Sequence, residues 1–153
     1  MTQTIKRVPY DHPDLLALVG ELDAYFYETW GEVALQYQSY HNLHAMACAL
    51  VCYVEGVPAG CGCWKPLKAG TAEMKRMYVR PRYRRCGIAG RILTALVQDA
   101  RAQGYPHAVL ETGADDTRAI AFYEAAGYRI CPPYGAFVGD THCVCMEKQE
   151  EDR

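Results

Sequence analysis

The spacing of apolar residues alternates along the chain between a helical period and a strand period. Over residues 13–30 the apolar side chains recur at i, i+3, i+4 and i+7, which is the spacing of one helix face. Pro13 suits the first turn of this helix, and Gly31 is expected to end it. Residues 71–79 are rich in types that suit a pleated strand, and residues 88–97 return to the helical spacing. The pattern therefore predicts a mixed α/β protein.

The complete pattern gives the element order β-α-α-β-β-β-α-β-α-β-β. Strands are expected at residues 4–8, 46–54, 59–64, 71–79, 107–112, 128–130 and 142–148, and helices at 13–30, 32–40, 87–103 and 117–126. Residues 55–58 are expected to form a hairpin turn. A chain of 153 residues fits one domain with a single core, so residues 1–153 are taken as one domain.

Composition indicates a globular protein of a reducing compartment. Half of the residues are apolar, which is ample for a core. We expect no membrane span, because no run of roughly eighteen apolar residues is present. We also expect no secretory signal, because no basic segment followed by an apolar one opens the chain. The eight cysteines then favour free thiols and a cytoplasmic location.

Several cysteines have the spacing of one strand face, for example Cys61 with Cys63 and Cys143 with Cys145. Zinc is the alternative interpretation of such pairs. No Cys-x-x-Cys pair or His-x₃-His partner accompanies them. We therefore expect small buried hydrophobic side chains and no metal.

Charge is distributed unevenly. No Lys or Arg occurs at residues 8–64, where seven acidic residues lie, and the basic residues resume at Lys65. The acidic half favours either a cationic acceptor or only a solvated helix face. The compact basic cluster and the mildly acidic isoelectric point argue against a nucleic-acid partner.

The segment Arg-Arg-Cys-Gly-Ile-Ala at residues 84–89 joins the strand at 71–79 to the next helix. A loop that opens a helix presents several free backbone N–H groups at the positive helix end, which makes an anion site. Gly87 lets a ligand approach the backbone closely. The segment therefore predicts a phosphate-binding loop.

The loop sequence indicates which class of phosphate-containing ligand it would bind. Neither Gly-x-x-x-x-Gly-Lys-Ser/Thr nor Gly-x-Gly-x-x-Gly is present. The pattern Arg-x-x-Gly-x-Ala instead resembles the pyrophosphate loop, Gln/Arg-x-x-Gly-x-Gly/Ala, of the GCN5-related N-acetyltransferase (GNAT) family. The other similar segments are Glu-Met-Lys-Arg-Met-Tyr-Val at 73–79, Leu-Glu-Thr-Gly at 110–113 and Ala-Phe-Tyr-Glu-Ala-Ala-Gly-Tyr at 121–128. The resemblance is specific over residues 71–130.

The resemblance implies a GNAT-type mixed, mostly antiparallel sheet flanked by helices, with acetyl-CoA as co-substrate. The residues that it implies at the pyrophosphate are Arg84, Arg85, Gly87, Ile88, Ala89 and Gly90. It further implies that backbone groups of Met77, Tyr78 and Val79 meet the pantetheine and the oxyanion. A bulge would free these groups, and the blurred strand period at 75–77 is consistent with one.

Transfer of an acetyl group to an amine needs a base, an oxyanion donor and an acid. By resemblance, Tyr123 is the tyrosine that meets the CoA sulfur, and a phenol of pKa near ~10 suits protonation of a thiolate. Tyr123 could otherwise be a core residue that stacks with Phe122 and Tyr128. Glu73 matches the base of some family branches, with Glu111 as a rival. Glu73 could equally be a surface charge paired with Lys75.

The acceptor side is less defined. A stripe of apolar and aromatic residues would wall an acceptor pocket or belong to the core: Phe26, Trp30, Val33, Tyr37 and Tyr40. Tyr134 or Phe137 could contribute from the loop that follows Pro133. Arg118 could reach a phosphate where the family often has Asn.

We expect an acetyl-CoA-dependent N-acetyltransferase that acts on a primary amine of a small molecule. The alternatives are a protein lysine or N-terminal acetyltransferase and a non-catalytic acyl-CoA sensor. Fold alone does not decide among them. The acceptor, the acyl chain preference and the oligomeric state are left open, with a homodimer among the alternatives.

Overall fold

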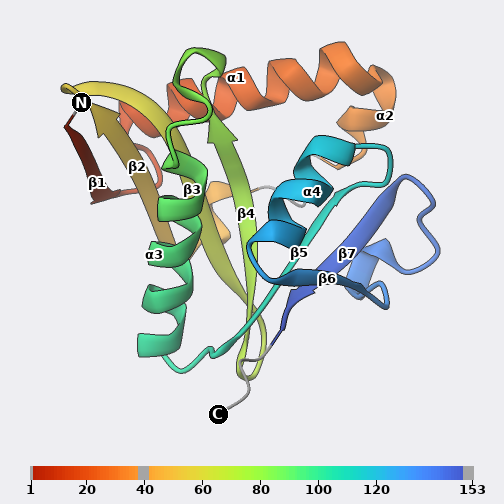
Figure 1. Ribbon diagram of the computed structural model, residues 1–153. Helices are drawn as coiled ribbons and strands as arrows, with labels where there is room; N and C mark the ends of the chain where they lie inside the picture. Colours follow the sequence, from red (N-terminus) through yellow and green to blue (C-terminus); the bar gives the residue numbers. More distant parts are fainter. Residues whose placement is uncertain (1, 38–41, 150–153) are drawn as a thin grey trace.

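The computed structural model describes residues 2–37 and 42–149. Its elements are β1 (Gln3–Val8), α1 (Pro13–Trp30), α2 (Glu32–Leu35), β2 (Cys48–Val54), β3 (Val57–Lys68), β4 (Thr71–Val79), α3 (Ile88–Ala102), β5 (His107–Gly113), α4 (Thr117–Ala125), β6 (Tyr128–Cys131) and β7 (Cys143–Lys148) (Figure 1). The strands form one seven-stranded sheet in the order β1-β2-β3-β4-β5-β7-β6. Neighbours run antiparallel except β4 and β5. The predicted mixed, mostly antiparallel sheet flanked by helices is confirmed.

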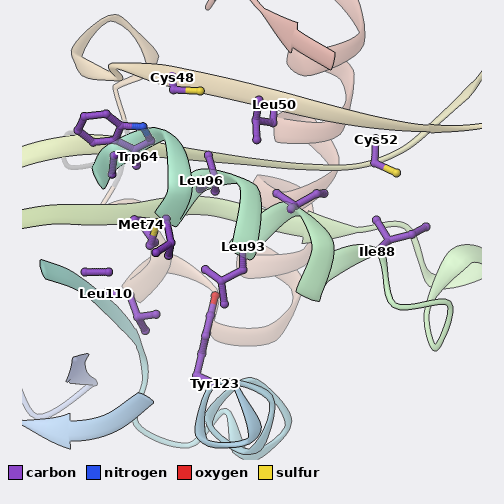
Figure 2. Close-up of a cluster of buried hydrophobic side chains, with 14 of the residues drawn as sticks. Cys48, Leu50, Cys52, Trp64, Met74, Ile88, Leu93, Leu96, Leu110 and Tyr123 are labelled. Carbon is purple, nitrogen blue, oxygen red and sulfur yellow. The ribbon is translucent and has the colours of Figure 1, made fainter. Parts of the chain in front are cut away.

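Helices cover both faces of the sheet, and β2 shows how the sequence achieves this. Cys48, Leu50 and Cys52 pack with α3, whereas the intervening Ala49 and Val51 pack with α1. Successive side chains of a strand point to opposite faces, so this strand contributes to two apolar layers. Figure 2 shows the layer under α3, which also includes side chains from α4.

The element boundaries that differ most from the sequence prediction are those of β3 and α2, while most others shift by one or two residues. The β2–β3 turn consists only of Glu55 and Gly56, with φ values of 49° and 79°, so β3 begins at Val57 and not at residue 59. Positive φ at both central residues is typical of the tight hairpin turn that matches strand twist. The β3 strand also continues to Lys68 rather than ending at 64. Helix α2 ends at Leu35, and residues 38–40 of the predicted second helix lie outside the described residues.

A bulge interrupts β4 at the position where the strand period blurs. Cys61 pairs with Tyr78 while Cys63 pairs with Lys75, so Gly62 stands opposite both Arg76 and Met77. Arg76 adopts a φ of 57°, as a bulged residue can. The parallel pairing with β5 ends before the bulge: β4 and β5 pair only over Thr71–Glu73 and His107–Val109. The two strands then diverge (Figure 1).

Ion pairs hold α1 against β4. The buried Arg76 guanidinium donates to the Asp23 carboxylate and to the Val19 carbonyl oxygen. Arg80, just after β4, makes hydrogen bonds of 2.7–3.1 Å to the Glu21 carboxylate, and Arg80 thereby lowers the pKa of Glu21. Part of the acidic sequence before residue 64 thus neutralises arginines of this chain.

The eight cysteines are all free thiols, and five of them are buried. Within residues 2–37 and 42–149, no group of three or more His, Cys, Asp or Glu side chains could hold a metal ion. Among the same residues, no helix combines the length and apolar character needed to cross a bilayer.

Gly62→Ala should destabilise the protein. An added Cβ would lie 2.6 Å from Met77 Sδ, 2.8 Å from Ile92 Cγ2 and 3.0 Å from Leu96 Cδ1. Overpacking of this kind costs about 1–3 kcal/mol. Gly20→Ala is the matched control, because it adds the same methyl group to α1 with no atom within 4 Å. It should stabilise by up to ~1 kcal/mol through helix propensity. Urea unfolding measures both, and equal stability of the two variants would contradict this packing.

Candidate active site

A cavity of about 570 Å³ opens where β4 and β5 separate. Its walls come from β4, β5, α1, α2, α4, the loop before α3 and the start of β7. Arg84 and Arg85 line it beside the start of α3, and aromatic residues of α1 contribute another part of its lining. The cavity therefore connects the predicted phosphate loop with the predicted acceptor side.

The predicted phosphate loop forms one end of the cavity. Arg84, Arg85, Gly87, Ile88, Ala89 and Gly90 all line it. Gly87 is the N-cap of α3 with a φ of 76°, and no side chain caps the helix there. The first N–H groups of this 15-residue helix are thus available to an anion. Arg84 Nε donates to the Val79 carbonyl at 3.0 Å, which fixes the loop to the end of β4.

A brace from β1 supports the same loop. Gln3 Nε2 donates to the Cys86 carbonyl at 3.0 Å, and Arg91 Nη1 donates to Gln3 Oε1 at 2.6 Å. Cys86 itself is exposed. Arg118 of α4 also lines the cavity, and Asp116 caps α4 by accepting from the Ala119 N–H at 3.1 Å.

The edge of β4 forms the cavity wall next to the loop. Met77, Tyr78 and Val79 all line the cavity beyond the bulge, in the part of β4 that β5 does not pair. The Tyr78 hydroxyl donates to Glu21 Oε1 at 3.2 Å and so turns toward α1. Because β5 does not pair with this part of β4, backbone N–H and C=O groups on this edge can bind a ligand.

Tyr123 of α4 lines the same cavity as the loop and the aromatic residues of α1. It is 9% exposed and rises from α4 with its hydroxyl toward Leu93 of α3 (Figure 2). Its ring contacts Phe122 and Tyr128, with centroid separations of 5.1 and 5.9 Å. Burial raises the pKa of Tyr123, so the phenol holds its proton at neutral pH. Tyr123 therefore both packs against Phe122 and Tyr128 and lines the cavity.

Glu73 is buried behind the cavity wall and is not one of the residues that line it. The Tyr134 hydroxyl donates to its carboxylate at 2.6 Å, and Lys75 Nζ lies 3.4 Å away. The pairing with Lys75 therefore exists, but both side chains are only 3% exposed. Phe137 is likewise buried, and Lys75 Nζ lies 5.4 Å from its ring centroid. The role of Glu73 as base stays a prediction.

Glu111, the rival carboxylate, does line the cavity. Burial raises the pKa of Glu111, and the positive charge of Lys75 partly opposes the shift. Sequence reasoning missed Lys75 and Cys143 as wall residues. The alternation of side chains on β4 signals that Lys75 shares a face with Glu73. No local sequence pattern indicates that Cys143 lines the cavity, because its neighbours there come from distant segments of the chain.

Aromatic residues line the predicted acceptor end of the cavity. Tyr25, Phe26, Trp30 and Tyr37 line the cavity together with Val33, although Gly31 breaks the helix between them. Trp30 Nε1 donates to Asp115 Oδ1 at 3.0 Å, which joins α1 to the loop before α4. Tyr40 lies outside the described residues. Tyr134 and Phe137 are not among the residues that line the cavity.

Comparison with known proteins assigns the class. Residues 15–128 match the acetyltransferase (GNAT) family. The chain therefore belongs to the GNAT family and is an N-acetyltransferase, as its sequence predicts.

Individual relatives agree with this assignment. An IAA acetyltransferase of Azospirillum brasilense is 31% identical over 141 residues, which cover 88% of this chain and 89% of that one. The uncharacterized N-acetyltransferase YsnE of Bacillus subtilis (strain 168) is 33% identical over 93 residues, 60% of this chain and 62% of its own length. A putative acyl-CoA N-acyltransferase structure from Klebsiella pneumoniae superposes with a TM-score of 0.81 at 30% identity, covering 96% of this chain and 97% of that chain.

Gly87→Glu should abolish binding of acetyl-CoA, because the carboxylate would bring bulk and negative charge to the N-terminus of α3. Gly70→Glu is the matched control. Gly70 has the same φ of 76° in a turn away from the cavity, so it carries the same backbone strain. Calorimetry with acetyl-CoA measures both folded variants. Unchanged affinity in Gly87→Glu, or equal losses in both, would contradict the phosphate assignment.

Proposed function

We propose that the protein transfers the acetyl group of acetyl-CoA directly to a primary amine of a small molecule. The observation that carries the proposal is the continuity of the cavity from the uncapped N-terminus of α3, past Tyr123, to the aromatic residues of α1. A donor and an acceptor that enter from the two ends would meet beside Tyr123.

The residues at the α3 end suit acetyl-CoA. Backbone N–H groups at residues 87–90, with Arg84 and Arg85, would hold the pyrophosphate, and the free edge of β4 at Met77–Val79 would hold the pantetheine. Acetyl-CoA supplies the activated thioester that the amine attacks. Structures of the same fold at about 20% identity include a PaiA N-acetyltransferase from Thermoplasma acidophilum in complex with coenzyme A and a GNAT acetyltransferase from Elizabethkingia anophelis with acetyl-CoA bound.

The aromatic end supports a small-molecule acceptor. Phe26 and Trp30 lie with centroids 5.7 Å apart and offer faces against which an apolar body can pack. The relative from Azospirillum brasilense is named an IAA acetyltransferase, which favours a small molecule over a protein. A panel of phenethylamine, tryptamine, hexylamine, spermidine, free lysine and a lysine peptide, with detection of released thiol, tests the proposal. Acetylation of the peptide alone would favour the protein acceptor, and no turnover would contradict the proposed function.

Tyr123 is proposed as the acid that protonates the departing thiolate. Its hydroxyl stays protonated at neutral pH because burial raises the pKa of Tyr123. Glu73 and its rival Glu111 are both candidate bases in this scheme: Glu111 lines the cavity, whereas Glu73 would act from behind the wall through Lys75 or Tyr134.

Tyr123→Phe should keep acetyl-CoA affinity and lower kcat by roughly 10²–10⁴-fold, the usual contribution of a positioned acid. Tyr128→Phe is the matched control, because Tyr128 stacks on the same ring but does not line the cavity. Its buried hydroxyl has no hydrogen-bond partner among the described residues, so its loss should leave kcat near wild type. Steady-state kinetics with the best amine of the panel measures kcat for both variants and for wild type. Equal kcat in Tyr123→Phe and wild type would contradict the acid role.

A further inference from the structure

Acetylation of an amine releases a proton that must leave the cavity. The ammonium R–NH₃⁺ becomes the amide R–NH–CO–CH₃, so the nitrogen loses two protons. One proton departs with coenzyme A as its thiol, and the other must reach solvent. A site that encloses its substrates needs a group that accepts this proton and a path that carries it away.

Glu111 faces the acceptor end of the cavity. It precedes Gly113 by two residues on β5, so both positions point to the same face of the strand. The Trp30 indole fills the space where a side chain of Gly113 would lie, 3.2 Å from an added Cβ. The Glu111 carboxylate therefore shares its face of the sheet with the aromatic residue that lines the acceptor end.

The surrounding charges leave Glu111 as the carboxylate available to an ammonium. Glu73 neutralises Lys75 at 3.4 Å and accepts from Tyr134, whereas no ion pair among the described residues includes Glu111. The titratable groups around Glu111 come from β4, α4, β7 and the segment before β7: Lys75, Glu73, Tyr123, Cys143, Cys145, Tyr134 and Asp140. Burial raises the pKa of Glu111, which brings this base closer to neutral pH.

A chain of side chains connects Glu111 with the surface. Glu111 pairs directly with Cys145 across the sheet, and Cys143 lies diagonally from Glu111 on the same face, opposite Gly113, which has no side chain. Glu111, Tyr37 and Cys143 all line the same cavity, and the Glu111 carboxylate and the Tyr37 hydroxyl both influence the pKa of the Cys143 thiol. The Tyr37 hydroxyl donates to Asp140 Oδ2 at 2.5 Å, and Asp140 is partly exposed. Burial raises the pKa of Cys143 to about 12, so this thiol carries a proton at neutral pH.

We infer that Glu111 accepts a proton from the acceptor ammonium, and that Cys143, Tyr37 and Asp140 conduct it to solvent. This inference rests on the proposed function. The ammonium N–H bond breaks and an O–H bond forms on Glu111. Glu111 then protonates Cys143 Sγ while the Cys143 proton passes to Tyr37 and the Tyr37 proton to Asp140, which releases it to water. The second nitrogen proton restores the Tyr123 hydroxyl after Tyr123 has protonated the thiolate, so every group returns to its starting protonation state and no group is oxidised or reduced.

The base is tested by the pH profile of kcat/KM with the best amine of the panel. Wild type should lose activity as the pH falls through the raised pKa of Glu111, because the protonated carboxyl cannot accept a proton. Glu111→Gln should lower kcat by about 10²–10⁴-fold, flatten this acidic limb and leave acetyl-CoA affinity unchanged by calorimetry. Glu73→Gln should keep the limb. A limb that persists in Glu111→Gln, or that disappears in Glu73→Gln instead, would overturn the inference.

The path is tested by Tyr37→Phe and Asp140→Asn. Each should lower kcat several-fold with little change in KM and should enlarge the solvent isotope effect. Tyr53→Phe is the matched control, since it removes a similar hydrogen bond, Tyr53 to Asp14 Oδ2 at 2.6 Å, away from the cavity. Tyr37→Phe should add no further loss to Glu111→Gln, because both act on one proton.

The outcomes separate the two proposals. Fully multiplicative losses in the double variant, or equal effects of Tyr37→Phe and Tyr53→Phe, would overturn the path. Asp140 is partly exposed, so Asp140→Asn should fold and tests the path even if Glu111→Gln does not fold. A wild-type protein that acetylates no amine of the panel would overturn the proposed function and the inference together.

Discussion

The bulge at Arg76 is the constraint on which the site depends. It places Arg76 and Met77 opposite Gly62, in the part of β4 that no longer pairs with β5, because the β4–β5 pairing ends at Glu73. An unbroken parallel ladder would pair the backbone of Met77–Val79 with β5 and leave no space between the strands. Gly62 is required on the facing strand, because any side chain there would meet the core under α3. The cavity, the free edge of β4 and the position of Tyr123 all follow from this separation.

The buried charge of Arg76 determines the position of α1, which forms another wall of the site. Arg76 is 5% exposed, and its guanidinium reaches through the sheet layer to Asp23 and the Val19 carbonyl of α1. A buried cation without a partner would cost several kcal/mol, so this pairing determines where α1 can lie. Arg80 repeats the arrangement with Glu21. The aromatic residues Phe26 and Trp30, one and two turns further along α1, are thereby held over the acceptor end.

The sequence predicted those features that neighbouring residues determine. The loop at 84–90, the element order and the break in β4 each depend on a short segment, and the structure brings the loop, Met77–Val79 and Tyr123 to one cavity. The choice between Glu73 and Glu111 could not be made from sequence, because both lie on strands at positions compatible with a base. Only the three-dimensional arrangement shows that Tyr134 and Lys75 enclose Glu73. The contacts among Cys143, Tyr37 and Asp140 join segments about a hundred residues apart, which no local pattern records.

Hydrogen exchange of β4 with and without acetyl-CoA tests the account most directly. Residues 76–79 pair with β3 on one side but have no β5 neighbour on the other, so the amides that do not bond to β3 depend on the ligand for protection. We predict that acetyl-CoA slows exchange in residues 76–79 and 84–90 and leaves the β1–β2 pair unchanged. Exchange at residues 76–79 that is already slow without ligand, or that acetyl-CoA does not alter, would contradict the claim that the separated strand edge holds the donor.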